Sequence, residues 1–565
     1  GGVPNTPLGS VSLDFNEDEY LDLLIAIEGQ YSQLYKNEAH PEQPSSFELV
    51  PASTFKNNSP PYSSRSFAIA DVNNDGRPGF FAASETYQTI FASSHPDSGY
   101  YLYNATDLNS IALFAGDSWA GAWGDYDADG WVDLYVCRAD GDSLAPGQLT
   151  PLADRLFRSK GLATGAGGEY VAFEASTDGG ELPTVANAST AASWGDADGD
   201  GDLDIVVGSL DPVGQNPGQR TDYYINDGDG SFTQVSRNTT GPRMSQDFGY
   251  VSGLAWADYD RDGDSDLVVS RQNPYLPGQQ YGLVVCRNNG SGYLETATPF
   301  QGSPDRPVAA FGLADVDLDG WTDILTVPVE DGQWPLLYAN TVATMDSLVE
   351  VVQTSGLTQG AAKGVAIGDY NHDGDPDVYL SRPNDPVTPE FFFENARSNE
   401  VGANFVQIRL KSLSRANNGM GMGSTVTVTA GTETYVQMVD GGSGGNGQVP
   451  GTLTFGLGEY SHSYVTAEVL WPDGYVTLVP AFTGQLNTIE DDHDTGLNLS
   501  LIGFMPVNHP GGLVDWVFHW HTDYSSDYSL DRVQILAPTA SANPIVRAKN
   551  TTAAVNLALT VSEFL

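Results

Sequence analysis

Short apolar segments alternate with polar, aspartate-rich loops along most of the chain. Before each loop stands an apolar stretch that ends in small residues, such as AGAWGD or GVAIGD, and after it a β-branched run such as LYVC or IVVGS. A third stretch follows, for example QLYKN, YYLYN or LLYAN, and most repeats add a fourth, such as SFELV or SFTQV. Four short strands in units of about 60 residues are typical of β-propeller blades. The pattern therefore predicts an all-β fold with a seven-bladed β-propeller over residues 9–397, after an N-terminal arm at 1–8.

One nine-residue loop recurs seven times, with starts 54 to 71 residues apart. It carries Asp or Asn at positions 1, 3 and 5, usually Gly at position 6, and Asp at position 9. Hard cations such as Ca²⁺ take six to eight oxygen ligands, which a curled loop of this kind supplies from alternate side chains, the position-7 carbonyl and a closing bidentate Asp. The five full copies span 125–133, 196–204, 258–266, 315–323 and 369–377, and two weaker copies span 14–22 and 71–79.

The predicted ligands are loop residues at positions 1, 3, 5 and 9, except position 9 of the second copy, and in the five full copies also the residue at position 7. In the two weaker copies they are Asp14, Asn16, Asp18, Asp22, Asp71, Asn73 and Asp75. In the third to fifth copies they are Asp125, Asp127, Asp129, Trp131, Asp133, Asp196, Asp198, Asp200, Asp202, Asp204, Asp258, Asp260, Asp262, Asp264 and Asp266. In the last two they are Asp315, Asp317, Asp319, Trp321, Asp323, Asp369, Asn371, Asp373, Asp375 and Asp377. We expect five to seven Ca²⁺ ions, one per loop.

Neither an EF-hand nor a set of solvated turns accounts for the loops as well. An EF-hand needs Glu at position 12 and helical flanks, whereas these loops have apolar residues there and strand-like flanks. Solvated turns would explain one copy, but not seven with the same flanks. The first copy has Glu19 in place of Gly and is expected to bind less tightly. The second has Gly79 in place of the closing Asp, so we expect a weak or empty site, and the substitution Gly79→Asp is expected to add one.

These loops, together with the LYxN strand, resemble the FG-GAP/VCBS repeat, which is also found in integrin α-subunit propellers. The resemblance implies a seven-bladed propeller with calcium loops between the first and second strands of each blade, in an extracellular or cell-surface setting. Residues 398–492 contain NNGMGMGSTVTV, TFGLG and WPDGYV, which resemble the ASPIC/UnbV domain that follows such propellers in cartilage acidic protein-like proteins. Where that family commonly has basic residues, this chain has Met420 and Met422.

The tail at 497–565 alternates cleanly in VDWVFHWHTD and AAVNLALTV and resembles part of an immunoglobulin-like or fibronectin-like sandwich, although it is shorter than the ~100 residues of such a domain. His519, His521 and Asp523 could bind a metal, but a polar strand face explains them better. The uncharged N-terminal arm could fray, close the ring or add a strand to a neighbouring molecule. Seven N-x-S/T triplets are possible glycosylation sites: Asn57, Asn104, Asn187, Asn238, Asn289, Asn498 and Asn550.

Composition narrows the function classes. With 73 acidic and 24 basic residues, the formal net charge of −49 argues against nucleic acid or an anionic membrane as a partner. No apolar run is long enough to span a bilayer, and a signal peptide, if the chain is exported, is expected to have been removed. The two cysteines, Cys137 and Cys286, are expected to be inert strand thiols. GGSGG at 441–445 fits a nucleophile motif but lacks its strand-to-helix context.

We therefore expect a non-enzymatic, secreted or cell-surface calcium-binding protein with a structural or adhesive role. Its expected partners are other proteins, above all copies of itself, joined into filaments through terminal strands. One alternative is a glycan-binding lectin that uses Tyr100, Tyr101, Tyr223 and Tyr224, although packing between strands accounts for these side chains better. The least favoured alternative is a secreted hydrolase.

Overall fold

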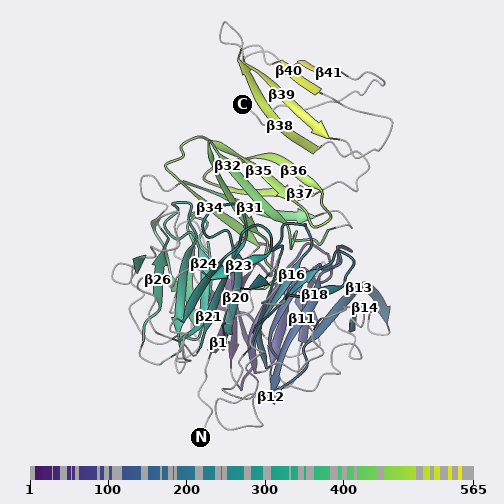
Figure 1. Cartoon of the computed structure of the whole chain (residues 1–565), viewed down its shortest axis with the longest axis vertical. Helices are drawn as coiled ribbons and strands as arrows, with labels where there is room; N and C mark the ends of the chain where they lie inside the picture. The colour runs from purple at the N-terminus through teal and green to yellow at the C-terminus, as the bar shows by residue number, and fades with distance from the viewer. Residues whose placement is uncertain are drawn as a thin grey trace.

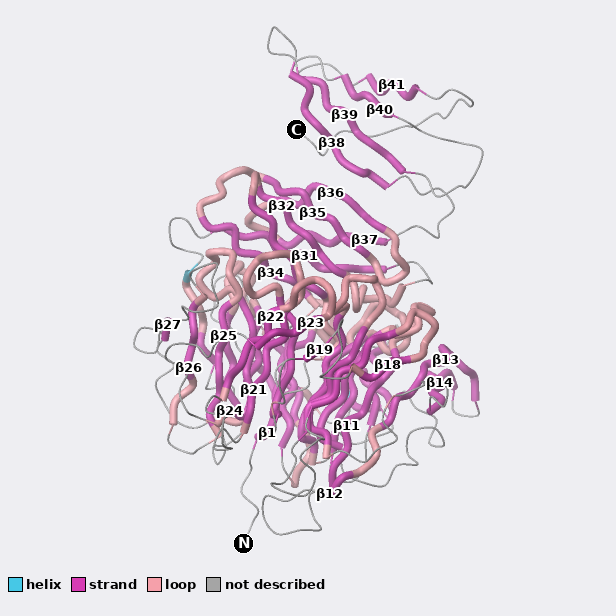
Figure 2. Tube along the Cα trace, in the orientation of Figure 1, coloured by secondary structure: helices cyan, strands magenta, loops and turns pink. Residues whose placement is uncertain are grey.

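Across the residues that the structure describes, the extended elements are β-strands connected by loops (Figures 1 and 2). The all-β class predicted from the sequence is therefore confirmed. The computed structural model describes residues 7–27, 29–38, 47–51, 54–56, 61, 63–84, 89–94, 101–104, 118–140, 150–165, 168–175, 182, 188–209, 221–235, 243–244, 248, 251–272, 282–296, 307–329, 333–340, 349–350, 362–381, 392–397, 404–412, 417–442, 451–491, 500–508, 514–521, 532–536 and 545–549.

In the part of the chain that the structure describes, seven sheets follow one another along the first two thirds of the sequence. In each, consecutive strands pair antiparallel, and two sheets also gain a short parallel edge strand. The first four are β1 (Pro7–Leu13), β2 (Asp22–Ile27), β3 (Gln33–Asn37), β4 (Phe47–Leu49); β6 (Ser64–Ala70), β7 (Gly79–Ser84), β8 (Thr89–Ser94), β9 (Tyr101–Asn104), with β5 (Phe55–Lys56) at the edge; β10 (Ser118–Gly124), β11 (Asp133–Asp140), β13 (Arg155–Gly165), β14 (Gly168–Ala175), with β12 (Thr150–Pro151) beside β11; and β15 (Ser189–Gly195), β16 (Asp204–Ser209), β17 (Thr221–Asn226), β18 (Phe232–Gln234). The last three are β20 (Val251–Ala257), β21 (Asp266–Arg271), β22 (Leu283–Arg287), β23 (Tyr293–Thr296), with β19 (Arg243–Met244) at the edge; β24 (Val308–Ala314), β25 (Asp323–Pro328), β26 (Leu336–Ala339), β27 (Val349–Glu350); and β28 (Gly364–Gly368), β29 (Asp377–Ser381), β30 (Phe392–Phe393).

The strand assignment made from the sequence was wrong in the second sheet. YLYN was expected to be the third strand, but Thr89–Ser94 pairs with β7 and occupies that place, and YLYN is the fourth strand, β9. The segment TIFASS lacks the LYxN motif that marks third strands elsewhere. Because YLYN resembles the motif more closely, it was assigned as the third strand although it is the fourth.

Neighbouring sheets pack through their first strands. β1 contacts β6, and the series continues through β10, β15, β20 and β24 to β28, which contacts β1. A separate apolar cluster fills each junction, and the one between the seventh and first sheets contains Leu23, Ile25, Ala366 and Tyr379. Close approach is needed here: a Cβ at Gly195 would lie 2.7 Å from the Trp256 ring of the next sheet.

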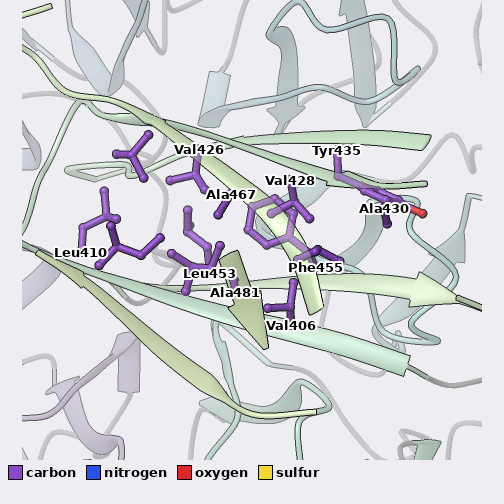
Figure 3. Packing of buried hydrophobic residues seen from close by; sticks show 14 of the residues in the cluster. Val406, Leu410, Val426, Val428, Ala430, Tyr435, Leu453, Phe455, Ala467 and Ala481 are labelled. Atoms are coloured by element: carbon purple, nitrogen blue, oxygen red, sulfur yellow. The ribbon is translucent and has the colours of Figure 1, made fainter. Parts of the chain in front are cut away.

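Two further sheets, joined by one buried cluster, follow at 404–491 (Figure 3). The cluster includes Val406, Val426, Phe455 and Trp471, all at most 1% exposed. One sheet consists of β34 (Thr452–Gly458), β31 (Asn404–Ser412) and β37 (Leu486–Asp491), and the other of β33 (Glu433–Met438), β32 (Thr425–Ala430), β35 (Tyr464–Leu470) and β36 (Val476–Phe482). These sheets lie over one end of the seven-sheet unit (Figure 1).

The described part of the tail forms one antiparallel sheet. Its strands are β38 (Ser500–Asn508), β39 (Val514–His521), β40 (Arg532–Leu536) and β41 (Ile545–Lys549), and β38 contacts β36. His519 and His521 lie on β39, while Asp523 and the segment AAVNLALTV lie outside the described residues.

Candidate metal centres: seven aspartate loops

Each nine-residue loop connects the first and second strands of its sheet, and all seven share one hydrogen-bond pattern. Oδ2 of the position-1 Asp accepts the amide of position 6 at 2.6–3.2 Å. The position-5 Asp accepts the amide of position 7 through Oδ1 at 2.9–3.3 Å. In the loop at 125–133 the acceptors are Asp125 and Asp129, and the donors are Gly130 and Trp131. These bonds curl the loop so that its side chains converge.

The curl needs left-handed backbone at position 4 as well as at position 6. Position 4 has positive φ in every loop although only one is glycine, for example Ala128 at 51° and Arg261 at 59°. Position 6 is equally left-handed, including the non-glycine Glu19 at 73°. The sequence indicated the turn at position 6 but gave no signal at position 4, because non-glycine residues rarely adopt this region.

In four loops the position-3 aspartate has a buried carboxylate oxygen that accepts no hydrogen bond from the protein. Oδ1 of Asp127, Asp198, Asp260 and Asp317 is buried in each case and accepts no hydrogen bond. Buried acceptors without donors are rare and costly, and a bound cation is the partner that an anionic oxygen in this setting lacks. In four loops three carboxylates place oxygens within 4.8 Å of one another: Asp125, Asp127 and Asp133; Asp196, Asp198 and Asp204; Asp258, Asp260 and Asp262; Asp315, Asp317 and Asp323.

These all-oxygen clusters fit a hard divalent cation. The other three loops have Asn16, Asn73 or Asn371 at position 3, so they present fewer carboxylates in the same arrangement. In these loops the Asn side chain donates to the position-5 Asp at 2.9–3.0 Å. In four loops the structure thus brings together three of the predicted carboxylates, and these acidic clusters could hold a metal ion.

Position 9 has a structural role that the sequence did not reveal. The six aspartates there are at most 2% exposed: Asp22, Asp133, Asp204, Asp266, Asp323 and Asp377. Oδ2 of each accepts the position-2 amide at 2.9–3.3 Å. Oδ1 accepts, at 2.7–2.9 Å, the amide of the residue that follows the third strand's apolar run. The carboxylate therefore ties three strands together, and only its remaining lone pairs can reach an ion.

The residue that follows the third strand's apolar run is asparagine in five sheets. Its side chain reaches across to the preceding sheet. Nδ2 of Asn226 donates to the Tyr126 carbonyl at 2.8 Å, so the fourth sheet is bonded to the loop of the third. Asn288, Asn340 and Asn395 repeat the bond, and Asn37 of the first sheet donates to the Tyr370 carbonyl of the seventh loop at 2.8 Å. The final Asn of the LYxN motif is thus a contact between sheets. The motif was visible in the sequence, but its partner was not.

The second loop is assembled like the others up to position 6, but it cannot gain the missing carboxylate. Asp71 and Asp75 make the usual bonds, whereas a Cβ on Gly79 would overlap the Phe91 carbonyl oxygen of the neighbouring strand. The expectation that Gly79→Asp would add a site is therefore not supported. We predict instead that Gly79→Asp adds no calcium ion in a titration and lowers the free energy of unfolding by about 1–3 kcal/mol, because backbone must move.

When no cation is bound, burial and repulsion between carboxylates favour the protonated form of the position-9 carboxyls by raising their pKa. Burial, followed by neighbouring carboxylates, raises the pKa of Asp204 and Asp266 to about 8 and that of Asp377 to about 9. Because these values lie above those of the unfolded chain, the native state binds more protons between about pH 4 and 9. The calcium-free protein is therefore expected to lose stability as the pH rises through this window.

Calcium reverses this dependence because the ion requires the ionised form. We expect the increase in melting temperature caused by calcium to be much larger at pH 8.5 than at pH 5.5, as measured by scanning calorimetry with and without chelator. A calcium-induced increase that is the same at both pH values would contradict the assignment of these carboxyls as ligands.

Comparison with known proteins gives two matches to family profiles. The profile described as ASPIC and UnbV matches residues 414–492, and the FG-GAP-like repeat profile matches residues 208–269. The chain combines FG-GAP-like repeats with an ASPIC/UnbV domain. The resemblance noted in the sequence is thereby confirmed.

Curated relatives include cartilage acidic protein 1 from Xenopus tropicalis, 23% identical over 275 residues, and from Homo sapiens, 26% identical over 278 residues. Each match covers 47% of this chain, and the chain spans only about two fifths of the length of these relatives. Among solved structures, an Agrocybe aegerita lectin that recognises non-reducing terminal N-acetylglucosamine is 14% identical, with a TM-score of 0.41 over 66% of this chain and 88% of the lectin. The V. cholerae biofilm matrix protein Bap1 is 12% identical, with a TM-score of 0.27 over 97% of this chain and 81% of Bap1.

The ASPIC/UnbV domain lies directly on the calcium-type loops of the FG-GAP-like repeats. Nε2 of Gln407 donates to Oδ2 of Asp369 at 2.8 Å, and Arg261 pairs with Glu433 at 2.9 Å. The Gly458 amide donates to the Leu318 carbonyl at 3.0 Å. Met422, one of the two methionines singled out in the sequence, is 2% exposed in a cluster with Trp123 and other residues of the second and third sheets. At this position the chain thus has an apolar contact between domains.

Several other residues singled out in the sequence can now be placed. Tyr223 and Tyr224 are 1% and 2% exposed, so neither can stack on a glycan, and strand packing explains both. The side chains of Tyr100 and Tyr101 lie outside the described residues. Cys137 on β11 and Cys286 on β22 are both fully buried, and neither forms a disulfide. Among the described residues no helix is long and apolar enough to cross a membrane.

Of the seven triplet asparagines, the structure places two. Asn289 is exposed in a turn, and its side chain accepts amides of Ser291 and Tyr293. Asn104 ends β9, with its side chain outside the described residues. The other five lie outside the described residues: Asn57, Asn187, Asn238, Asn498 and Asn550.

Proposed function

We propose that this chain is a calcium-binding, seven-bladed β-propeller whose loop face is covered by its ASPIC/UnbV domain. The observation that carries the proposal is the set of buried position-3 oxygens without donors, in Asp127, Asp198, Asp260 and Asp317. Five to seven ions would bind, one per loop. When bound, Ca²⁺ neutralises the converging carboxylates and links the first two strands of each blade.

Contacts around the whole series of sheets support a closed ring. The inner strand β28 packs against β1, and Asn37 donates to Tyr370 across the same junction, as its counterparts do between other sheets. The proposed units are an arm at 1–8, a propeller at 9–397, the ASPIC/UnbV domain at 398–492 and a sandwich-like segment at 497–565.

We also propose a non-enzymatic structural or adhesive role outside the cell. The dense carboxylate pairs of the chain are held in loops where a cation would keep them ionised, which makes them poor general acids. Extracellular calcium is abundant enough to occupy modest sites. The similarity to cartilage acidic protein 1 is compatible with that setting.

Calcium stoichiometry tests the proposal. The calcium-depleted full chain, titrated with CaCl₂ in equilibrium dialysis, is expected to bind five to seven ions. Asp317→Ala should lose one ion, whereas Asp227→Ala, which removes an exposed carboxylate on the β17–β18 turn, should lose none. Binding of no calcium at millimolar concentration would refute the proposal.

Self-association is the partner that the tail supports best. Its described strands form one sheet in which β38 and β41 are the outer strands, and an outer strand can pair with a strand of a second copy. We expect calcium-loaded protein to form chains or filaments in electron micrographs as concentration rises. Particles that stay monomeric at every concentration would exclude assembly but leave calcium binding intact.

A further inference from the structure

One register position in or next to the third strand contacts the calcium-type loop in four sheets, and its residue type differs between sheets. It immediately precedes the residue whose amide donates to Oδ1 of the position-9 Asp. That hydrogen bond fixes its register in six sheets. In the second sheet the pairing of Phe80 with Phe91 fixes it instead. We call it the third-strand position: Lys36, Ala92, Arg158, Ile225, Arg287, Ala339 and Glu394.

In the first, third and fifth sheets the third-strand position is basic and contacts loop carboxylates. Nζ of Lys36 lies 3.6 Å from Oδ2 of Asp18. Arg158 pairs through Nε with Oδ2 of Asp127 and through Nη2 with Asp129, the latter at 3.2 Å. Nε of Arg287 lies 2.8 Å from Oδ2 of Asp260.

In the remaining sheets the residue at the third-strand position is not basic. Ile225 and Ala339 bring no charge to the loops of the fourth and sixth sheets. In the seventh sheet Oε1 of Glu394 accepts a hydrogen bond from Nδ2 of Asn371, the position-3 residue, at 3.3 Å. One register position thus presents a cation, an apolar side chain or an additional carboxylate to otherwise similar loops.

We propose that the third-strand position sets the calcium affinity of each loop, an inference that rests on the calcium binding proposed above. A basic residue there weakens the site, an apolar residue leaves it at the strength of its own ligands, and Glu394 strengthens the seventh site. The sites of one chain would then fill over a range of calcium concentrations instead of together.

Two opposing effects of a basic side chain must be weighed. The guanidinium groups of Arg158 and Arg287 hold Asp127 and Asp260 in place through Oδ2, which would favour binding. Such half-exposed ion pairs, however, change the population of a side-chain conformation only a few-fold. Repulsion between a single positive charge and a divalent ion a few ångströms away corresponds to about ten-fold in affinity even at the dielectric constant of water. Repulsion therefore dominates, and salt should reduce it.

Terbium luminescence isolates one site for the test. The test uses the full chain with all its tryptophans, because Trp194 and Trp256 lie two residues before the fourth and fifth loops and Trp321 lies in the sixth. Trp131 occupies position 7 of the third loop, so the part of the tryptophan-excited luminescence that Trp131→Phe abolishes is assigned to that loop. Arg158→Met in the full chain is expected to tighten terbium binding, and its displacement by calcium, about ten-fold at low salt. Arg155→Met removes the same charge from the same strand, where the guanidinium bonds to the Asp154 carbonyl, and should change the affinity less than two-fold.

The opposite change provides a second readout. In equilibrium dialysis of the full chain, Glu394→Gln is expected to weaken one calcium site about ten-fold, and Arg287→Met to tighten another by the same factor. Affinities unchanged within two-fold in Arg158→Met, Arg287→Met and Glu394→Gln, with calcium still bound, would overturn this inference and leave the proposed function standing. A chain that binds neither terbium nor calcium would refute both.

Discussion

Removal of calcium with excess EDTA is expected to lower the melting temperature of the full chain by about 15 °C. A ligand that binds only the native state contributes about 2.7 kcal/mol per site at a concentration one hundred times its Kd. Five sites would contribute more than about 10 kcal/mol, and each kcal/mol shifts the melting temperature of so large a unit by about 1–2 °C. Differential scanning calorimetry at pH 8, with calcium and with EDTA, measures the difference.

The same treatment should open the loops locally. Without the ion, the carboxylates at positions 1, 3 and 5 repel one another, so we expect faster proteolysis within loops 125–133 to 369–377. EDTA saturated beforehand with calcium is the control for effects of the chelator itself. A melting curve that is unchanged in excess EDTA would count against calcium at these loops.

Much of the fold could be predicted because the repeat makes each local signal redundant. The apolar runs around Asp125–Asp133 and its counterparts have the period of strands, and the spacing of aspartates within each loop matches the convergence seen in the structure. The second sheet was misassigned where its motif departs from the others, at TIFASS. Where one repeat departs from the others, the remaining repeats no longer predict its strands correctly.

Long-range partners could not be predicted, since they depend on how sheets are placed in space. Nothing next to Asn37 in the sequence indicates that its amide meets Tyr370, which is 333 residues away. Likewise, the overlap between Gly79 and the Phe91 carbonyl becomes visible only once the strands are paired. The ion pairs of Arg158 and Arg287 with loop carboxylates also come from strand register and not from sequence proximity.

The position-9 carboxylate joins these local and long-range interactions, and in Asp204 it accepts the amides of both Ala197 and Asn226. Its value as a ligand and its value as a structural acceptor can be separated by experiment. Without calcium and at pH 6, Asp204 is largely protonated because burial raises its pKa to about 8, so its removal relieves little repulsion. Only the structural part of its contribution is then measured.

Asp204→Ala is expected to lower the free energy of unfolding by about 2–6 kcal/mol under these calcium-free conditions. Two buried amides lose their acceptor, and each unsatisfied group costs about 1–3 kcal/mol. Asp202→Ala is the matched control, because this residue of the same loop is only partly buried, and a change within about 0.5 kcal/mol is expected. Urea denaturation of both variants gives the comparison. Equal costs would show that the carboxylate at position 9 serves the ion alone, and the three-strand tie seen in the structure would then contribute nothing to stability.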